Sequence, residues 1–189
     1  MKVIVPNYIV FQCSGKNITE LDLFHCPELR ELRCYNNQLT ELDLSHCPNL
    51  EILQCDRNQL TELDLSHCPK LIDLLCYNNN LFQLYLSYCT KLNQLDCSNN
   101  QLAELDLLNC QEIEYIECNY NKLRELDLSY CPKIIVLGCE DNLLDELTLS
   151  IYNTVKYYSW KNNPLYSEEN NTLEKLEKHN RNSSTYILK

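Results

Sequence analysis

Cysteine recurs along this 189-residue chain at alternating intervals of 13 and 8 residues, and the interval never slips. The two intervals together make a period of 21 residues. A fixed period of about 20–50 residues is typical of stacked structural units, each of which buries its apolar side against its neighbours. The period therefore predicts a solenoid with a long surface rather than an enzyme built around a pocket. The thirteen cysteines are Cys13, Cys26, Cys34, Cys47, Cys55, Cys68, Cys76, Cys89, Cys97, Cys110, Cys118, Cys131 and Cys139.

One copy of the repeat runs from Leu29 to Asn49 and reads LRELRCYNNQLTELDLSHCPN. Seven full copies begin at Tyr8, Leu29, Leu50, Leu71, Leu92, Ile113 and Ile134, and an eighth copy begins at Val155 and decays after Leu165. The shared pattern, LxxLxCxxNxLxxLDLSxCPx, resembles that of the leucine-rich repeat family, with cysteine in one leucine position. Its two halves also resemble each other, as in the short irregular 21-residue class of that family. The resemblance covers roughly residues 8–165 and implies a leucine-rich repeat solenoid.

Each repeat contains two segments that alternate as a β-strand does. In L-x-x-L-x-C the fourth and sixth positions point to one side, and the third and fifth point to the other. Coils stacked in register would align these segments into a parallel β-sheet of short strands, about 4.8 Å apart. The L-D-L motif alternates as well, so we expect a second extended segment in each repeat and two outward faces. The inward residues of the first segment are Phe11, Leu32, Leu53, Leu74, Leu95, Ile116, Leu137 and Tyr158.

We expect a single solenoid domain over residues 1–189. Its parts are an N-terminal edge at 1–7, seven full repeats at 8–154, a partial eighth repeat at 155–166, a C-terminal capping helix at 167–182 and a tail at 183–189. Ser167 would cap that helix at its start. Within the tail, Thr185–Leu188 is a candidate for a last short strand. No stretch approaches the roughly 20 apolar residues of a membrane span, so no membrane partner is expected.

An asparagine follows each cysteine of the first segment except Cys13 by three residues. A chain that turns sharply after a strand leaves backbone groups in need of partners, and an inward amide can both donate and accept. We therefore predict a structural ladder of stacked amides, whereas the preceding outward residue, Asn99 in one repeat, should tolerate substitution. Lys16 takes the ladder position in the first repeat, where an irregular turn is expected. The ladder residues are Asn37, Asn58, Asn79, Asn100, Asn121, Asn142 and Asn163.

The cysteine columns are interpreted as reduced core positions that form a cysteine ladder. Trp160 and Tyr152 continue the two columns, and a slot that accepts such side chains is a hydrophobic slot. The odd number of cysteines and the lack of a visible export signal argue against disulfides. No C-x2-C pair is present, and period two places His25, His46 and His67 on the opposite side from the cysteines beside them. We predict no metal and no cofactor, and keep metal or thiol buffering as an alternative function.

The outward face of the predicted sheet carries apolar and tyrosine side chains on a polar background. Such a mixture is typical of protein-interaction surfaces, and the family resemblance implies protein binding on this face. The candidate binding residues are Ile52, Leu75, Tyr115, Val136 and Tyr157 on the strands, with Tyr35 and Tyr77 in the turns that follow.

The second outward face carries two acidic columns, whose eleven members equal the formal net charge of −11. Two interpretations stay open: the aspartates cap turns and the glutamates keep the face soluble, or the stripe attracts a basic partner or divalent cations. Both argue against nucleic acid, whose phosphates require Lys and Arg. The columns are Glu20, Glu41, Glu62, Glu104, Glu125 and Glu146, and Asp22, Asp43, Asp64, Asp106 and Asp127.

The fourth repeat interrupts this stripe with Phe82, Tyr85 and Tyr88. This aromatic interruption has the composition of a binding hot spot, although sequence drift in one repeat would look the same.

Nothing in the repeat indicates catalysis, because its acids are periodic rather than convergent on a cleft. The sequence predicts a non-enzymatic protein-binding scaffold that uses the outward face of the sheet; the alternative is a structural or self-assembling repeat module. We expect a monomer with a protein partner of unknown identity. We expect it to act in the cytoplasm, or in a host cytosol if the chain comes from a virus or an intracellular bacterium.

Overall fold

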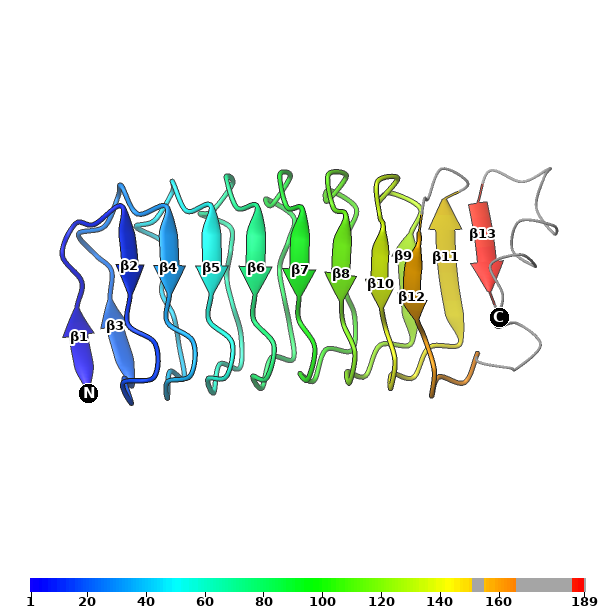
Figure 1. Cartoon of the computed structure of the whole chain (residues 1–189), viewed down its shortest axis with the longest axis horizontal. Coiled ribbons are helices and arrows are strands. Elements are labelled where there is room, and N and C mark those ends of the chain that lie inside the picture. The colour runs from blue at the N-terminus through cyan, green and yellow to red at the C-terminus, as the bar shows by residue number, and fades with distance from the viewer. Residues whose placement is uncertain (151–154, 166–184, 189) are drawn as a thin grey trace.

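The computed structural model describes residues 1–150, 155–165 and 185–188, and it is a parallel β-solenoid of about seven coils. Its main sheet has eight parallel strands that lie side by side along the long axis (Figure 1). Neighbouring strands pair in strict register at a separation of one repeat, so that Glu31 aligns with Ile52 and Ile52 with Asp73. The strands are β2 (Val10–Gln12), β4 (Glu31–Arg33), β5 (Ile52–Gln54), β6 (Asp73–Leu75), β7 (Gln94–Asp96), β8 (Tyr115–Glu117), β10 (Val136–Gly138) and β12 (Tyr157–Ser159).

The expected second extended segment forms a paired sheet only near the two ends of the solenoid. At one end β1 (Lys2–Ile4) pairs in parallel with β3 (Glu20–Asp22). At the other end β9 (Glu125–Leu128) pairs in parallel with β11 (Glu146–Ser150), and β13 (Thr185–Leu188) adds to β11 in antiparallel. Between them, the described residues contain a single bridge, from Asp64 to Tyr85. The expected capping helix at 167–182 lies outside the described residues.

The core between the two faces consists of stacked columns of leucine and cysteine. Leu32, Leu53 and Leu74 of the main sheet are completely buried. All thirteen cysteines are buried, which confirms the cysteine ladder. Burial raises the pKa of these thiols, to about 11 for Cys13 and to about 12 for Cys68. The cysteines therefore pack as small neutral hydrophobic side chains.

The asparagine ladder joins each coil to the one before it. The side chain of Asn100 donates to the carbonyl of Cys97 in its own coil at 3.0 Å and to that of Cys76 in the preceding coil at 3.1 Å. Its Oδ1 accepts the backbone N–H of Leu81, also in the preceding coil, at 2.9 Å. Because the same bonds recur from Asn37 to Asn163, one buried side chain per repeat satisfies the turn and fixes the stacking.

The residue before each ladder asparagine has a left-handed backbone. The φ angles of Asn36, Arg57, Asn78, Asn99, Tyr120, Asp141 and Asn162 lie between 52° and 57°. Left-handed backbone is costly for most side chains and least costly for Gly, Asn and Asp, which explains the asparagine pairs of the repeat. Asn99 is exposed, and its φ of 55° is a backbone constraint that the expected tolerance of this position did not include.

The first coil differs from the others in the conformation of its turn and in the residues that shield its core from solvent. Its turn contains two left-handed residues, Gly15 and Asn17, instead of one. The Oδ1 atom of Asn37 in the next coil accepts both the N–H of Lys16 and that of Ile18. Phe11 is only half-buried, and the exposed Tyr8 stacks on it with 5.9 Å between the ring centroids.

The buried thiols predict a steep loss of stability at alkaline pH. Thiols in an unfolded chain ionise with a pKa of about 8.5, whereas burial keeps them protonated in the folded chain. Above about pH 8.5 the unfolded state binds fewer protons, so the free energy of unfolding falls by up to about 1.4 kcal/mol per pH unit for each thiol. We expect the chain to unfold cooperatively at about pH 9–10. Circular dichroism during an alkaline titration, with a reductant present, measures this unfolding. A fold that persists unchanged through this range would contradict thiol burial.

Replacement of Asn100 by Leu should destabilise the solenoid strongly. The substitution leaves the buried N–H of Leu81 without its acceptor, at a cost of about 1–3 kcal/mol. It also removes one of the two amide donors to the carbonyls of Cys76 and Cys97, which keep those of Asn79 and Asn121. Denaturant unfolding measures the loss. Asn99→Gly is the matched control, because glycine adopts the left-handed backbone freely, and it should change stability by only a few tenths of a kcal/mol. Equal losses at the two positions would contradict the hydrogen-bonding role of the ladder.

Tyr120→Asn should stabilise the chain, because it places a side chain that tolerates the left-handed region where a bulky one now stands. The expected gain in unfolding free energy is about 0.5 kcal/mol or more. Tyr115→Asn, which alters an exposed strand residue, is the comparison and should bring no gain. Thermal unfolding of the two variants decides the matter, and a destabilised Tyr120→Asn protein would speak against backbone strain at this position.

Candidate interaction surfaces

The main sheet presents most of the predicted binding residues in two groups. Tyr115, Val136 and Tyr157 align on the adjacent strands β8, β10 and β12. Tyr115 is 41% and Tyr157 68% exposed, and Val136 is half-buried. Ile52 on β5 and Leu75 on β6, both half-buried, form the other group, which Asp73 and Gln94 separate from the first in the strand register.

The two predicted turn tyrosines, Tyr35 and Tyr77, are half-buried at the border of this sheet face. The guanidinium carbon of Arg57 lies 5.6 Å from the ring centroid of Tyr77, in a cation–π contact. The predicted residues thus form a discontinuous surface with Tyr115, Val136 and Tyr157 as its one continuous row.

Sequence reasoning missed the partly buried carboxyl groups of the sheet face. Burial raises the pKa of Asp73 and of Glu117 above the ordinary range, while nearby Arg33 acts in the opposite direction on Asp73. The Glu117 carboxylate occupies the space that a side chain at Gly138 would fill, and it accepts a hydrogen bond from Asn119 Nδ2 at 2.7 Å. A glycine inside an otherwise side-chain-bearing column was the available sequence signal.

The aspartates of the second face cap the turns that follow them. Asp43 accepts the backbone N–H of Ser45, and Asp64 that of Ser66, each at 2.9 Å. Hydrogen bonds from Ser45 and Ser66 lower the pKa of these two aspartates, because they favour the ionised form. The first of the two interpretations therefore accounts for the aspartate column.

The glutamates of the second face differ from one another in their contacts. Glu20 pairs with Lys2 at 2.6 Å. Glu41, Glu62 and Glu104 have no ion-pair partner within the described ranges.

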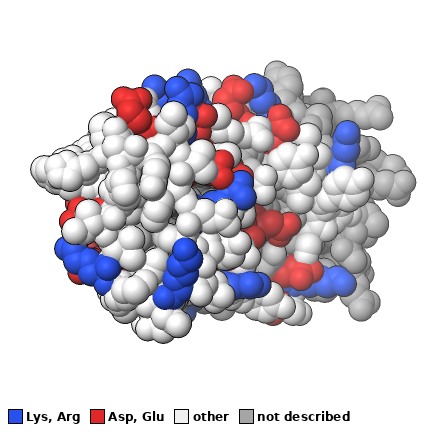
Figure 2. All heavy atoms as spheres, turned by 60° about the vertical axis from the view of Figure 1, so that its left-hand side comes forward, with Lys and Arg blue, Asp and Glu red and all other residues white. Residues whose placement is uncertain are grey.

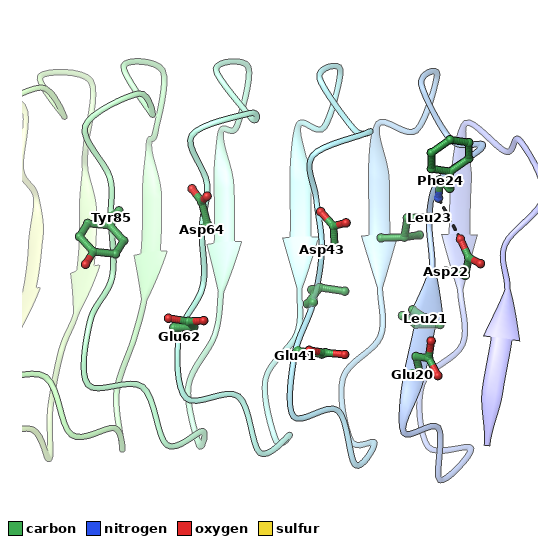
Figure 3. A pocket seen from close by; sticks show the side chains of 11 residues that line it. Glu20, Leu21, Asp22, Leu23, Phe24, Glu41, Asp43, Glu62, Asp64 and Tyr85 are labelled. Carbon is green, nitrogen blue, oxygen red and sulfur yellow. Dashed lines mark hydrogen bonds between the residues drawn. The ribbon is translucent and has the colours of Figure 1, made fainter.

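Two grooves lie along the second face. The first, of about 440 Å³, follows the four rungs from Glu20 to Tyr85, where a rung is the second extended segment of one repeat (Figure 3). The second, of about 340 Å³, follows the rungs from Glu104 to Thr148. Figure 3 shows the glutamates in one row and the aspartates in another, with Phe24 at one end and Tyr85 at the other.

The three residues of the aromatic interruption, Phe82, Tyr85 and Tyr88, are all exposed. Tyr85 lines the first groove and donates its hydroxyl to Oε1 of Gln83 at 2.8 Å. Phe82 and Tyr88 line neither groove.

The N-terminal end of the solenoid is apolar. Ile4, Tyr8, Ile9 and Val10 are all exposed there. Figure 2, in which this end comes forward, shows a broad area without charged side chains.

The part of the chain that the structure describes contains no group of three or more His, Cys, Asp or Glu side chains placed to hold a metal ion. His25 and His46 instead contact the ring of Phe24, at centroid distances of 4.8 and 4.4 Å. Among the same residues, no helix has the length and apolar character that crossing a membrane requires.

Comparisons with known proteins agree with this architecture. The family model described as leucine-rich repeats in two copies matches residues 27–67. The functional domain of InlJ from Listeria monocytogenes, described as including a cysteine ladder, is 32% identical over 80% of this chain and 38% of its own, with a TM-score of 0.66. No curated protein sequence matches the chain significantly.

Two further solved structures share the fold. YopM from Yersinia enterocolitica is 28% identical over 84% of this chain and 34% of its own, with a TM-score of 0.74. A leucine-rich repeat protein from Leptospira interrogans is 22% identical over 89% of this chain and 46% of its own, with a TM-score of 0.79. The chain thus spans less than half the length of each of these three structures. The 21-residue repeat, the solenoid with its cysteine ladder and these comparisons together identify the chain as a member of the leucine-rich repeat family.

Proposed function

We propose that this chain is a non-enzymatic scaffold that binds a protein partner on the outward face of its main sheet. Leucine-rich repeat proteins commonly mediate protein–protein interactions and are typically non-enzymatic. The observation that carries the proposal here is the row of Tyr115, Val136 and Tyr157 on three adjacent strands. Exposed tyrosines supply large contact areas with a polar tip, which suits a partner surface.

The partly buried carboxyls of the sheet face support the proposal. Asp73 and Glu117 are both half-buried, and Oδ1 of Asp73 is a buried acceptor without a hydrogen bond in the described structure. A partner that offers a donor or a cation to these groups would satisfy them while its apolar side chains cover the row. Such a combination of an apolar centre with a few polar anchors is typical of specific interfaces.

The double variant Ile52→Lys/Tyr115→Lys should abolish capture of the partner and leave thermal stability nearly unchanged. The matched control, Asn80→Lys/Leu143→Lys, adds the same charge at exposed turn positions outside the sheet. Immobilised wild type, variant and control should be compared in affinity capture from the native source, followed by titration of the purified partner. We expect binding at least tenfold weaker for the variant, about 1.4 kcal/mol, and no change for the control. Equal binding by all three proteins would refute the sheet-face site.

A second candidate function, end-to-end self-assembly, is favoured by the apolar N-terminal end. Ile9 and Val10 border the outer edge of β2, whose backbone has a strand neighbour on one side only. Unpaired strand edges with exposed apolar side chains favour association. Light scattering over a range of concentrations separates the candidates: association that Ile9→Lys abolishes would favour assembly, whereas a monomer at all concentrations would leave the scaffold as the function.

A further inference from the structure

On the second face, some leucines of the core are slightly exposed to solvent between the outward acidic residues. Four leucines of its inward column, Leu21, Leu42, Leu84 and Leu105, are 7–8% exposed, whereas Leu63, Leu126 and Leu147 are 0–1% exposed. Leu21 and Leu42 line the first groove, and Leu105 and Leu126 line the second, whereas Leu84 lines neither and belongs to a rung of the Asp64–Tyr85 bridge. The two grooves therefore have apolar floors.

The two grooves share one design. Glu104, Asp106 and Leu108 of the second groove lie four repeats after Glu20, Asp22 and Phe24 of the first. Phe24 and Leu108 each stand where most repeats have a small polar residue. Phe24 is 60% exposed and Leu108 is 46% exposed. The same departure from the repeat thus recurs at the same place in each groove. The other repeats have serine at this position, namely Ser45, Ser66, Ser87, Ser129 and Ser150.

The charge of the first groove is entirely negative. Six carboxylates line it, two on each of three successive rungs, and no Lys or Arg does. Each aspartate commits one oxygen to its turn, and Lys2 pairs with Glu20 and with Oδ2 of Asp22. Glu41, Glu62 and the second oxygens of Asp43 and Asp64 are left for a ligand. Since no three of these acids are placed around a common point, they suit several separate cationic groups along an extended ligand better than one metal ion.

We propose that the two grooves bind extended basic segments of a protein, with arginine or lysine heads on the carboxylates and apolar side chains on the leucine floor. Long cationic side chains bury their aliphatic stems on apolar surface while the charge stays at the rim. Tyr85 at the end of the first groove offers a ring on which a guanidinium can stack. A volume of about 440 Å³ holds a few side chains, so each groove takes a short segment. This site lies on the opposite side of the core from the main sheet (Figures 1 and 3).

Isothermal titration with a short peptide of alternating arginine and valine tests the proposal. Wild type should bind two peptides per chain, with affinity that falls as salt rises, and the corresponding glutamate–valine peptide should not bind. Glu41→Gln/Glu62→Gln should weaken the first site at least tenfold and leave one peptide bound per chain. Removal of these like charges relieves repulsion along the column, so the variant should stay folded, as circular dichroism verifies.

Two controls separate the groove from general attraction to an acidic protein. Glu28→Gln/Glu114→Gln removes two carboxylates outside both grooves and should change the affinity less than twofold. Phe24→Ser restores the repeat residue and should weaken the arginine–valine peptide severalfold while it leaves an oligolysine peptide unaffected. Equal weakening in the two glutamine variants, no effect of Phe24→Ser, or no binding to wild type would each overturn the proposal. The sheet-face variant Ile52→Lys/Tyr115→Lys should still bind two peptides, so this site and the sheet-face function can fail separately.

Discussion

The buried asparagine amide is the interaction on which the rest of this structure depends. From Asn37 to Asn142 one side chain per repeat donates to the cysteine carbonyls of two successive coils and accepts an N–H from the earlier coil, as Asn58 does. The turn after each strand is sharp and would otherwise leave these groups buried without partners. Strict strand register, stacked leucine and cysteine columns and a left-handed residue at every turn all follow once the amides are aligned. The protein can therefore vary its outward residues freely, since the coil is held from within.

Most of the fold was predictable from the sequence because a period of 21 residues permits few arrangements. The inward columns, the parallel sheet and the cysteine ladder follow from alternation and from stacking alone. The left-handed residue was not recognised, because a pair such as Asn99–Asn100 looks like two equivalent polar residues, and backbone geometry alone separates their roles. The partial pairing of the second segment was also not predictable, since the L-D-L motif is nearly identical where the rungs pair and where they stand apart.

The candidate surfaces were predictable in location but not in shape. The alternation of inward and outward residues in the two extended segments correctly placed Tyr115 on one outward face and the acidic columns on the other. The Glu117 carboxylate accepts a hydrogen bond from Asn119 and occupies the space that a side chain at Gly138 of the next coil would fill. The pattern of one column alone does not reveal this contact between two repeats. Each groove is lined by residues of at least three rungs, so no single repeat shows it.

The uneven pairing of the two faces has a mechanical consequence. Every coil is hydrogen-bonded to its neighbours along the main sheet, whereas the rungs opposite are joined mainly near the ends. Extension along the sheet would break the strand hydrogen bonds of every coil. A change of spacing at the unpaired rungs would disturb side-chain contacts and fewer backbone bonds, such as the one from the N–H of Gln59 to the carbonyl of Leu39. The solenoid should therefore bend most easily in its middle coils, with the sheet as the stiff side and the grooves opening or closing as it does. Its ends, where both faces are paired, would move as rigid blocks.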